Sequence, residues 1–126
     1  MTENRGIVSG IPAKFLKGEA IALFAFSIWL FAMQGIDWWW YPVLLFIPDV
    51  FMLGYLANTF LGAVIYNIGH SVIPGLVLCT VGAIITSPWL IALGAIWLGH
   101  VGFDRALGYG LKYHDSFKHT HLSDLK

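Results

Sequence analysis

Long apolar runs are the feature that most limits how this chain can fold. Of its 126 residues, 58% are hydrophobic and only 11% are charged. A soluble domain carries roughly 25% charged residues, which cover its surface with water-binding groups. The seven basic and seven acidic residues present here are too few to cover a domain of this size. The composition therefore predicts a protein that places its apolar surface in a membrane.

Four of the runs are close to the length of a transmembrane helix, which needs about 20 mainly apolar residues. Short turn-forming stretches separate them, and these contain Gly35, Asn58 and Pro88. We predict an all-α integral membrane bundle of four transmembrane helices that forms a single domain. The expected spans are residues 20–36, 41–57, 60–85 and 89–111, followed by a cytoplasmic tail over residues 112–126.

The distribution of basic residues predicts the orientation of these spans. Four spans place both termini on one side of the membrane, and the lysines and arginines gather in the terminal segments on that side. Cytoplasmic segments carry the excess of these residues, so both termini are expected in the cytoplasm. Aromatic residues at the other ends of the spans, Trp38 to Tyr41 and Trp89, are typical of anchors at the lipid headgroups.

Charge and cysteine content exclude other classes of protein. The formal net charge is zero, and no basic helix is present to follow a phosphate backbone, so nucleic-acid binding is not expected. Cys79 is the single cysteine and cannot form a disulfide within the chain. The membrane lipids are the partners that this composition predicts.

Ionisable residues interrupt the apolar runs, and they are the candidates for function. Asp49, His70 and His100 each fall near the middle of a run, and Asp104 follows His100 by one helical turn on the same face. Glu19 precedes the first run at its cytoplasmic edge. Such groups are costly inside a bilayer and normally face the bundle interior, where they serve a function. We therefore expect them to converge in one site that opens toward the cytosol.

Each of these residues also has a structural interpretation that the sequence leaves open. Asp104 is either a ligand or the ion-pair partner of Arg105 or Lys112. Asp49 is either protonated by desolvation or paired with a histidine or a metal on a neighbouring span. Glu19 is either part of the site or an acid favoured by the dipole at the start of a helix.

One helical turn of the third run carries several polar residues. Tyr66, Asn67, His70 and Ser71 lie on adjoining faces, and Pro74 follows. A proline at this position cannot donate to the carbonyl of His70, so we expect the helix to open beside the imidazole. The alternative is an ordinary proline kink that the hydroxyl of Ser71 stabilises.

The C-terminal segment carries a further group of polar residues. Tyr109 and Lys112 follow the fourth run, and three histidines come after them. Histidine-rich tracts bind metals. His121 is the preferred candidate because Phe117 and Leu122 give the segment an apolar side that would let it fold back over the bundle.

Two family resemblances follow from these residues. One is to a family of small bacterial membrane proteins catalogued only as a domain of unknown function; it covers nearly the whole chain and implies four helices in the bacterial cytoplasmic (inner) membrane. Pro48-Asp49 and His70-Ser71 are also similar to pairs that recur in membrane-bound metal-dependent hydrolases. Phe51 and Met52 stand where that second family has another aspartate. The first resemblance rests on Tyr66-Asn67-x-x-His70-Ser71, His100-x-x-x-Asp104-Arg105, Gly108-Tyr109-Gly110-Leu111-Lys112-Tyr113 and Phe117-x-x-Thr120-His121-Leu122.

Three functions are compatible with this pattern. The first is a metal-dependent hydrolase or lipid-modifying enzyme that acts on a lipid or isoprenoid and uses zinc, iron or manganese. Its metal ligands would be His70, His100, Asp104 and His121, with Asp49 or Glu19 as a further ligand or as the catalytic base that activates bound water. Further polar groups of the site would be Tyr66, Asn67, Ser71, Arg105, Tyr109 and Lys112. The second is an ion- or proton-handling protein that acts as a homo-oligomer. The third is a structural or partner protein whose polar residues only hold helices together.

Overall fold

The computed structural model describes residues 8–108, and this part of the chain contains helices and no strands. The expected all-α class is therefore confirmed. A helix begins or ends close to each of the three predicted breaks, and the side chains of Asn58 and Ser87 cap the helices that follow them. The elements are α1 (Gly10–Ala32), α2 (Trp40–Leu44), the 3-10 helix η1 (Ile47–Leu56), α3 (Thr59–His70), α4 (Ile73–Ile84) and α5 (Pro88–Ala106).

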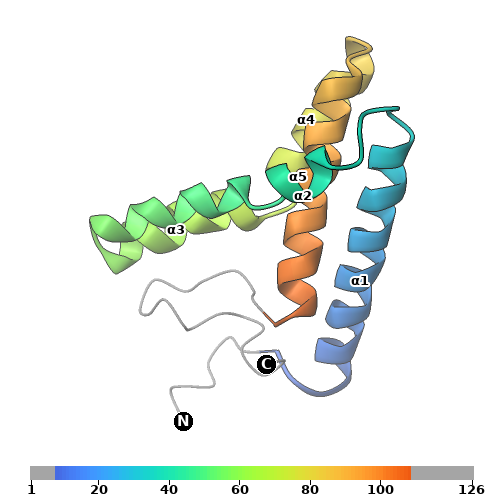
Figure 1. Cartoon of the computed structure of the whole chain (residues 1–126). Helices are drawn as coiled ribbons and strands as arrows, with labels where there is room; N and C mark the ends of the chain where they lie inside the picture. The colour runs from blue at the N-terminus through green and yellow to red at the C-terminus, as the bar shows by residue number, and fades with distance from the viewer. Residues whose placement is uncertain (1–7, 109–126) are drawn as a thin grey trace.

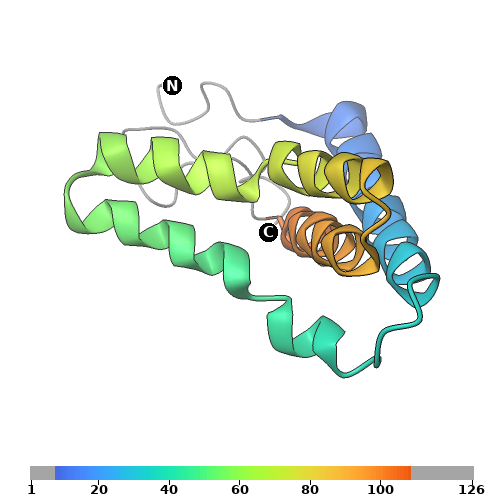
Figure 2. The same cartoon turned by 90° about the horizontal axis from the view of Figure 1, so that it is seen from above.

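Helix α5 lies at the centre of the fold. It packs along α1 on one side and along α4 on another, and the three helices run roughly side by side (Figures 1 and 2). The beginning of α1 and the end of α5 lie at the same end of this group (Figure 1). The buried core of the group includes Phe31, Ala92, Ala95 and Ile96.

Helices η1 and α3 form a second unit, an antiparallel hairpin that packs mainly against itself. Figure 1 shows that the hairpin extends away from α1, α4 and α5 and lies transverse to their long axes. Gly62 makes this close packing feasible, because a Cβ atom at that position would overlap the ring of Tyr55. The hairpin is apolar on its outer surface, where Val50, Leu53 and Ile68 are exposed.

The second and third expected spans are each broken into two helices. The first break is at residues 45–46, between α2 and η1, and the other is at residues 71–72, between α3 and α4. The opening expected before Pro74 is thus present: α3 ends at His70, and Ser71 adopts an extended conformation. The Ser71 hydroxyl donates to the carbonyl of Ile68 at 3.2 Å, so it satisfies a backbone group at the break.

The first helix is longer than the expected span. It begins at Gly10 rather than near residue 20, and Pro12 lies in its first turn, where a missing N–H costs no hydrogen bond. Glu19 consequently lies within α1 and not at its beginning. The dipole at a helix start therefore does not act on Glu19, because that effect is limited to the first turn.

Two helical stretches of the described chain are long and apolar enough to cross a membrane. They are α1 and the stretch Thr59–Ile84, which consists of α3 and α4 together. Large apolar side chains such as Phe15, Trp29 and Leu76 are exposed on these helices. Membrane association is the conclusion that these features support, and the arrangement of four spans belongs to the proposal below.

The contact between α1 and α5 depends on small residues, as the stripe Ala95, Gly99, Gly102 and Ala106 predicts. The fully buried Ser27 of α1 shares a hydrogen bond of 2.5 Å with the hydroxyl of Tyr41. Both hydroxyls lie against Gly99, where an added Cβ would overlap them. Tyr41, expected as a headgroup anchor, therefore turns inward to this contact.

Replacing Gly99 with alanine is expected to destabilise the protein by about 1–3 kcal/mol, the usual cost of overfilling a packed core. The added methyl group has to displace the Ser27–Tyr41 pair. Thermal unfolding in detergent measures the effect. Gly18→Ala is the matched control, since a Cβ there meets nothing within 4 Å. Equal melting temperatures for the two variants would contradict the prediction.

Candidate metal centre

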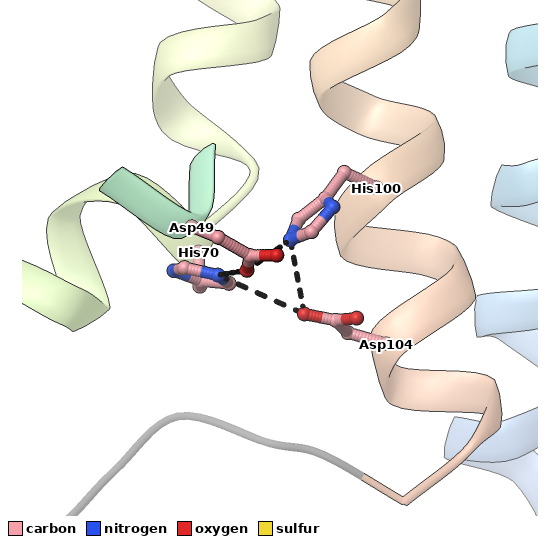
Figure 3. A group of neighbouring side chains, drawn as sticks. All are labelled: Asp49, His70, His100 and Asp104. Carbon is pink, nitrogen blue, oxygen red and sulfur yellow. Dashed lines mark hydrogen bonds and ion pairs between the residues drawn. The ribbon is translucent and has the colours of Figure 1, made fainter. Parts of the chain in front are cut away.

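Four ionisable side chains from three helices meet beside the two helix breaks. Asp49 comes from η1, His70 is the last residue of α3, and His100 and Asp104 lie one turn apart on α5 (Figure 3). One ligand atom from each of the four lies within 4.8 Å of the other three. The sequence predicts that these four residues converge, and in the structure they lie together.

The cluster is closed on its histidine side and open on its carboxylate side. His70 and His100 are 4% and 1% exposed, whereas the side chains of Asp49 and Asp104 are 41% and 17% exposed. The two imidazole rings lie in contact, with their centres 5.0 Å apart. The carboxylates are therefore the part of the cluster that lies nearest the surface.

The distances between the ligand atoms fit a single metal ion. Nε2 of His70 lies 3.1 Å from Asp49 Oδ1 and 3.7 Å from Asp104 Oδ2. Nε2 of His100 lies 3.2 Å and 3.1 Å from the same two oxygens. Ligands that surround a tetrahedral zinc ion at about 2.0–2.1 Å are separated from one another by about 3.4 Å. Four of the six separations are thus close to tetrahedral spacing, and all six lie within 4.8 Å.

The backbone sets the tautomer of His70. Nδ1 of this ring lies 3.0 Å from the carbonyl oxygen of Tyr66, and because a carbonyl only accepts, Nδ1 carries the hydrogen. In the neutral ring, Nε2 then has a lone pair that faces the carboxylates. The ring of Tyr66 stacks on the imidazole, with centres 3.8 Å apart and planes 6° apart. Metal-binding histidines are held in this way by a second hydrogen bond on the other nitrogen.

The arrangement needs positive charge at its centre. Carboxylate oxygens and the Nε2 lone pair of His70 all offer electrons, so their approach to about 3 Å is repulsive without a proton or a metal ion between them. Nε2 of His100 is buried and has no well-oriented hydrogen bond within residues 8–108. Two protons, one on each imidazole, or one divalent metal ion would neutralise the two carboxylates.

A tryptophan of α5 forms a hydrogen bond to the hairpin beside the cluster. Nε1 of Trp97 donates a hydrogen bond of 2.7 Å to the carbonyl of Gly69, the residue before His70. This carbonyl lies in the last turn of α3, where the helix offers it no backbone partner. Trp97 is not among the site residues predicted from the sequence. Its position three residues before His100, and hence on the same face of α5, was the available signal.

Trp97→Phe is expected to weaken metal binding about tenfold, because second-layer partners of metal ligands typically contribute 10–100-fold. The phenyl ring retains most of the packing and loses only the bond that fixes the end of α3. Titration with Co²⁺, followed by its visible absorption, measures the affinity. Trp29→Phe on the exposed face of α1 is the control. Wild-type affinity in Trp97→Phe would show that this bond does not position His70.

Other residues predicted for the site lie apart from the cluster or beside it. Glu19 is exposed on α1 and does not belong to the group of four. Asn67 is half-buried on α3, and Ser71 bonds to backbone at the break. Arg105 is half-buried, and within the described chain Asp104 pairs with the two histidines and not with Arg105. Tyr109, Lys112 and His121 lie outside the described residues.

The fold and the cluster define an all-helical protein with a buried histidine–carboxylate centre. The model of the family described as "Domain of unknown function (DUF4260)" matches residues 13–125, and the chain belongs to this family. The resemblance to a family of unknown function is thereby confirmed. No curated protein and no solved structure matches the chain.

Proposed function

We propose that this chain is a membrane-embedded, metal-dependent hydrolase whose Asp49, His70, His100 and Asp104 bind one divalent ion. The observation that carries the proposal is the spacing of the four ligand atoms, 3.1–3.7 Å between each nitrogen and each oxygen. Two imidazoles and two carboxylates suit zinc, iron or manganese. A divalent ion also neutralises the two carboxylates when both imidazoles are neutral.

Several features support a position in the bacterial cytoplasmic membrane. At 1.5 Å per residue, α1 and α5 are about 35 Å and 29 Å long, close to a hydrocarbon thickness of about 30 Å. The second and third spans expected from the sequence are broken, and η1 and α3 turn across the long axes of α1 and α5 (Figure 1). Broken helices at membrane depth occur where protein covers them or where they border a cavity. Both breaks here adjoin the ionisable cluster. The basic terminal segments then place the end of α5, and the open side of the cluster, toward the cytosol.

The open side of the cluster determines the chemistry. Water on this side would join the four side chains as a fifth ligand, as zinc sites allow, and a divalent metal lowers the pKa of such a water to about 7, which would supply a nucleophile at neutral pH. Asp49 is the most exposed ligand, and its second oxygen can accept the proton of that water. The buried histidines hold fixed positions through α5 and through the Tyr66 carbonyl.

Hydrolysis is tested by incubating the metal-loaded protein with bacterial lipid extract in water enriched in ¹⁸O. The proposal predicts ¹⁸O in a product released from a lipid, seen by mass spectrometry and lost in Asp49→Asn. Asp37→Asn, which removes an exposed carboxylate in a loop, is the control. Bound metal without any ¹⁸O-labelled product would contradict a hydrolase and leave the metal with a structural role.

The second candidate function is proton or ion handling by a homo-oligomer, favoured by the contact between two imidazoles that carboxylates flank. In this case the two protons are the cations of the cluster, and they move along it. Proteoliposomes would then show a proton flux that stops in Asp49→Asn and continues when metal is chelated. Flux that is absent in the wild type would exclude this alternative.

Metal binding is expected to release two protons in the limit where both imidazoles are protonated and both carboxylates are ionised, because each imidazole must give up one proton before it can ligate the ion. The affinity therefore rises with pH, by about 100-fold per pH unit in that limit. Calorimetry in buffers of different ionisation enthalpy counts the protons. Binding that does not depend on pH would contradict coordination by both histidines.

A further inference from the structure

An apolar cavity of about 260 Å³ lies beside the first helix break, between α2, η1, α4 and α5. Side chains from α2, η1, α4 and α5 surround it, and its walls are almost entirely carbon. Its walls include Leu44, Pro48, Leu78, Leu93, Ile96 and Trp97. Cavities with such walls bind hydrocarbon, because they offer no hydrogen bonds to water.

Residues of the cavity wall are neighbours of the proposed metal ligands. Pro48 is fully buried and directly precedes Asp49. Trp97 contributes one face of the cavity, and its indole N–H bonds to the residue before His70. Ile96 and Trp97 precede His100 by four and three residues, so they share its face of α5. Three of the four proposed ligands thus have a neighbour in the cavity wall.

We infer that the substrate is an amphiphile whose hydrocarbon chain occupies this cavity while its polar group reaches the metal. This inference rests on the proposed function and names the substrate class for it. The polar group would lie at the open, carboxylate side, and the hydrocarbon chain would run along Pro48 and Trp97. The bond to be broken would then lie at the end of the chain nearest the ion. An isoprenoid and a fatty acyl chain share this chemistry.

The test uses two metal-binding probes that differ only in chain length, acetohydroxamate and octanohydroxamate. Cobalt-loaded protein in lipid nanodiscs reports the binding of each probe through its visible absorption. Acetohydroxamate measures access to the metal alone, and octanohydroxamate adds six carbons that can enter the cavity. Each methylene group removed from water strengthens binding about fourfold, so two buried methylenes already give more than tenfold.

Leu93→Trp fills the cavity with an indole ring and leaves all four ligands in place. It is expected to weaken octanohydroxamate binding at least about tenfold and to leave acetohydroxamate binding unchanged. Leu78→Phe is a second filling variant from α4, for use if Leu93→Trp does not fold. Val77→Trp is the matched control, since Val77 lies on α4 beside Leu78 and is 54% exposed.

The outcomes separate this inference from the proposed function. Equal octanohydroxamate affinity in wild type and Leu93→Trp, with cobalt bound in both, would overturn the cavity assignment alone. An equal loss in Val77→Trp would also overturn it, because it would show that the chain binds to the general lipid surface. Failure to bind cobalt, or cobalt spectra that neither probe changes, would overturn both.

Discussion

Replacing His100 with alanine is expected to abolish stoichiometric metal binding, with a loss of affinity of at least about 100-fold, beyond the 10–100-fold that second-layer partners contribute. His100 is 1% exposed, and its Nε2 lies about 3 Å from both carboxylates. Its removal takes away one of the four ligands and leaves two carboxylates facing one histidine. Co²⁺ titration and elemental analysis of the purified protein measure the effect.

His100→Gln keeps most of the polar side-chain volume and serves if the alanine variant does not fold. Asp37→Asn is the control, because it removes a carboxylate from an exposed loop outside the cluster. Full metal content is expected in this control. Wild-type affinity in a folded His100→Ala or His100→Gln protein would show that the ion, if one binds, lies elsewhere.

Metal loading is expected to hold the η1–α3 hairpin against the central helices. The hairpin packs mainly against itself, and the cluster and the Trp97–Gly69 bond are specific links between it and α5. An ion bound by Asp49, His70, His100 and Asp104 would join the three elements directly. A ligand present at 100 times its dissociation constant stabilises the bound state by about 2.7 kcal/mol.

Hydrogen exchange measures this effect, since 2.7 kcal/mol corresponds to about 100-fold slower exchange for amides exposed by opening of the hairpin. The slowing is expected within α3 and at the break before α4. Amides in the middle of α1 are the internal control, and His100→Gln with metal present is the variant control. Uniform slowing over the whole chain, or none in α3, would contradict a metal that joins hairpin and bundle.

The residues of the cluster could be found from the sequence because charge is so rare in this chain. Asp49, His70, His100 and Asp104 stand out against apolar surroundings, and the one-turn spacing of the last two needs only helical periodicity. Pro74 likewise predicted the break beside His70, since its missing N–H leaves the carbonyl one turn before it without a partner. These inferences depend on local chemistry that neighbouring helices do not alter.

The directions in which η1 and α3 run could not be predicted from the sequence. Residues 47–70 are apolar on almost every face, so no periodic pattern indicates which side of η1 or α3 meets a partner. The second and third runs were therefore predicted as straight spans, whereas the structure has two shorter helices in each of them. Glu19 was expected near the cluster because the beginning of α1 was placed too late, and the full helix puts it on an exposed face.

X-ray absorption spectroscopy of the metal-loaded protein tests the central claim most directly. We expect nitrogen and oxygen ligands at about 2.0–2.1 Å for zinc, four from the protein and at most one water, with the scattering pattern of two imidazole rings. Loss of one ring in His100→Gln would complete the assignment. A sulfur ligand from Cys79, or six oxygens without imidazole scattering, would contradict it.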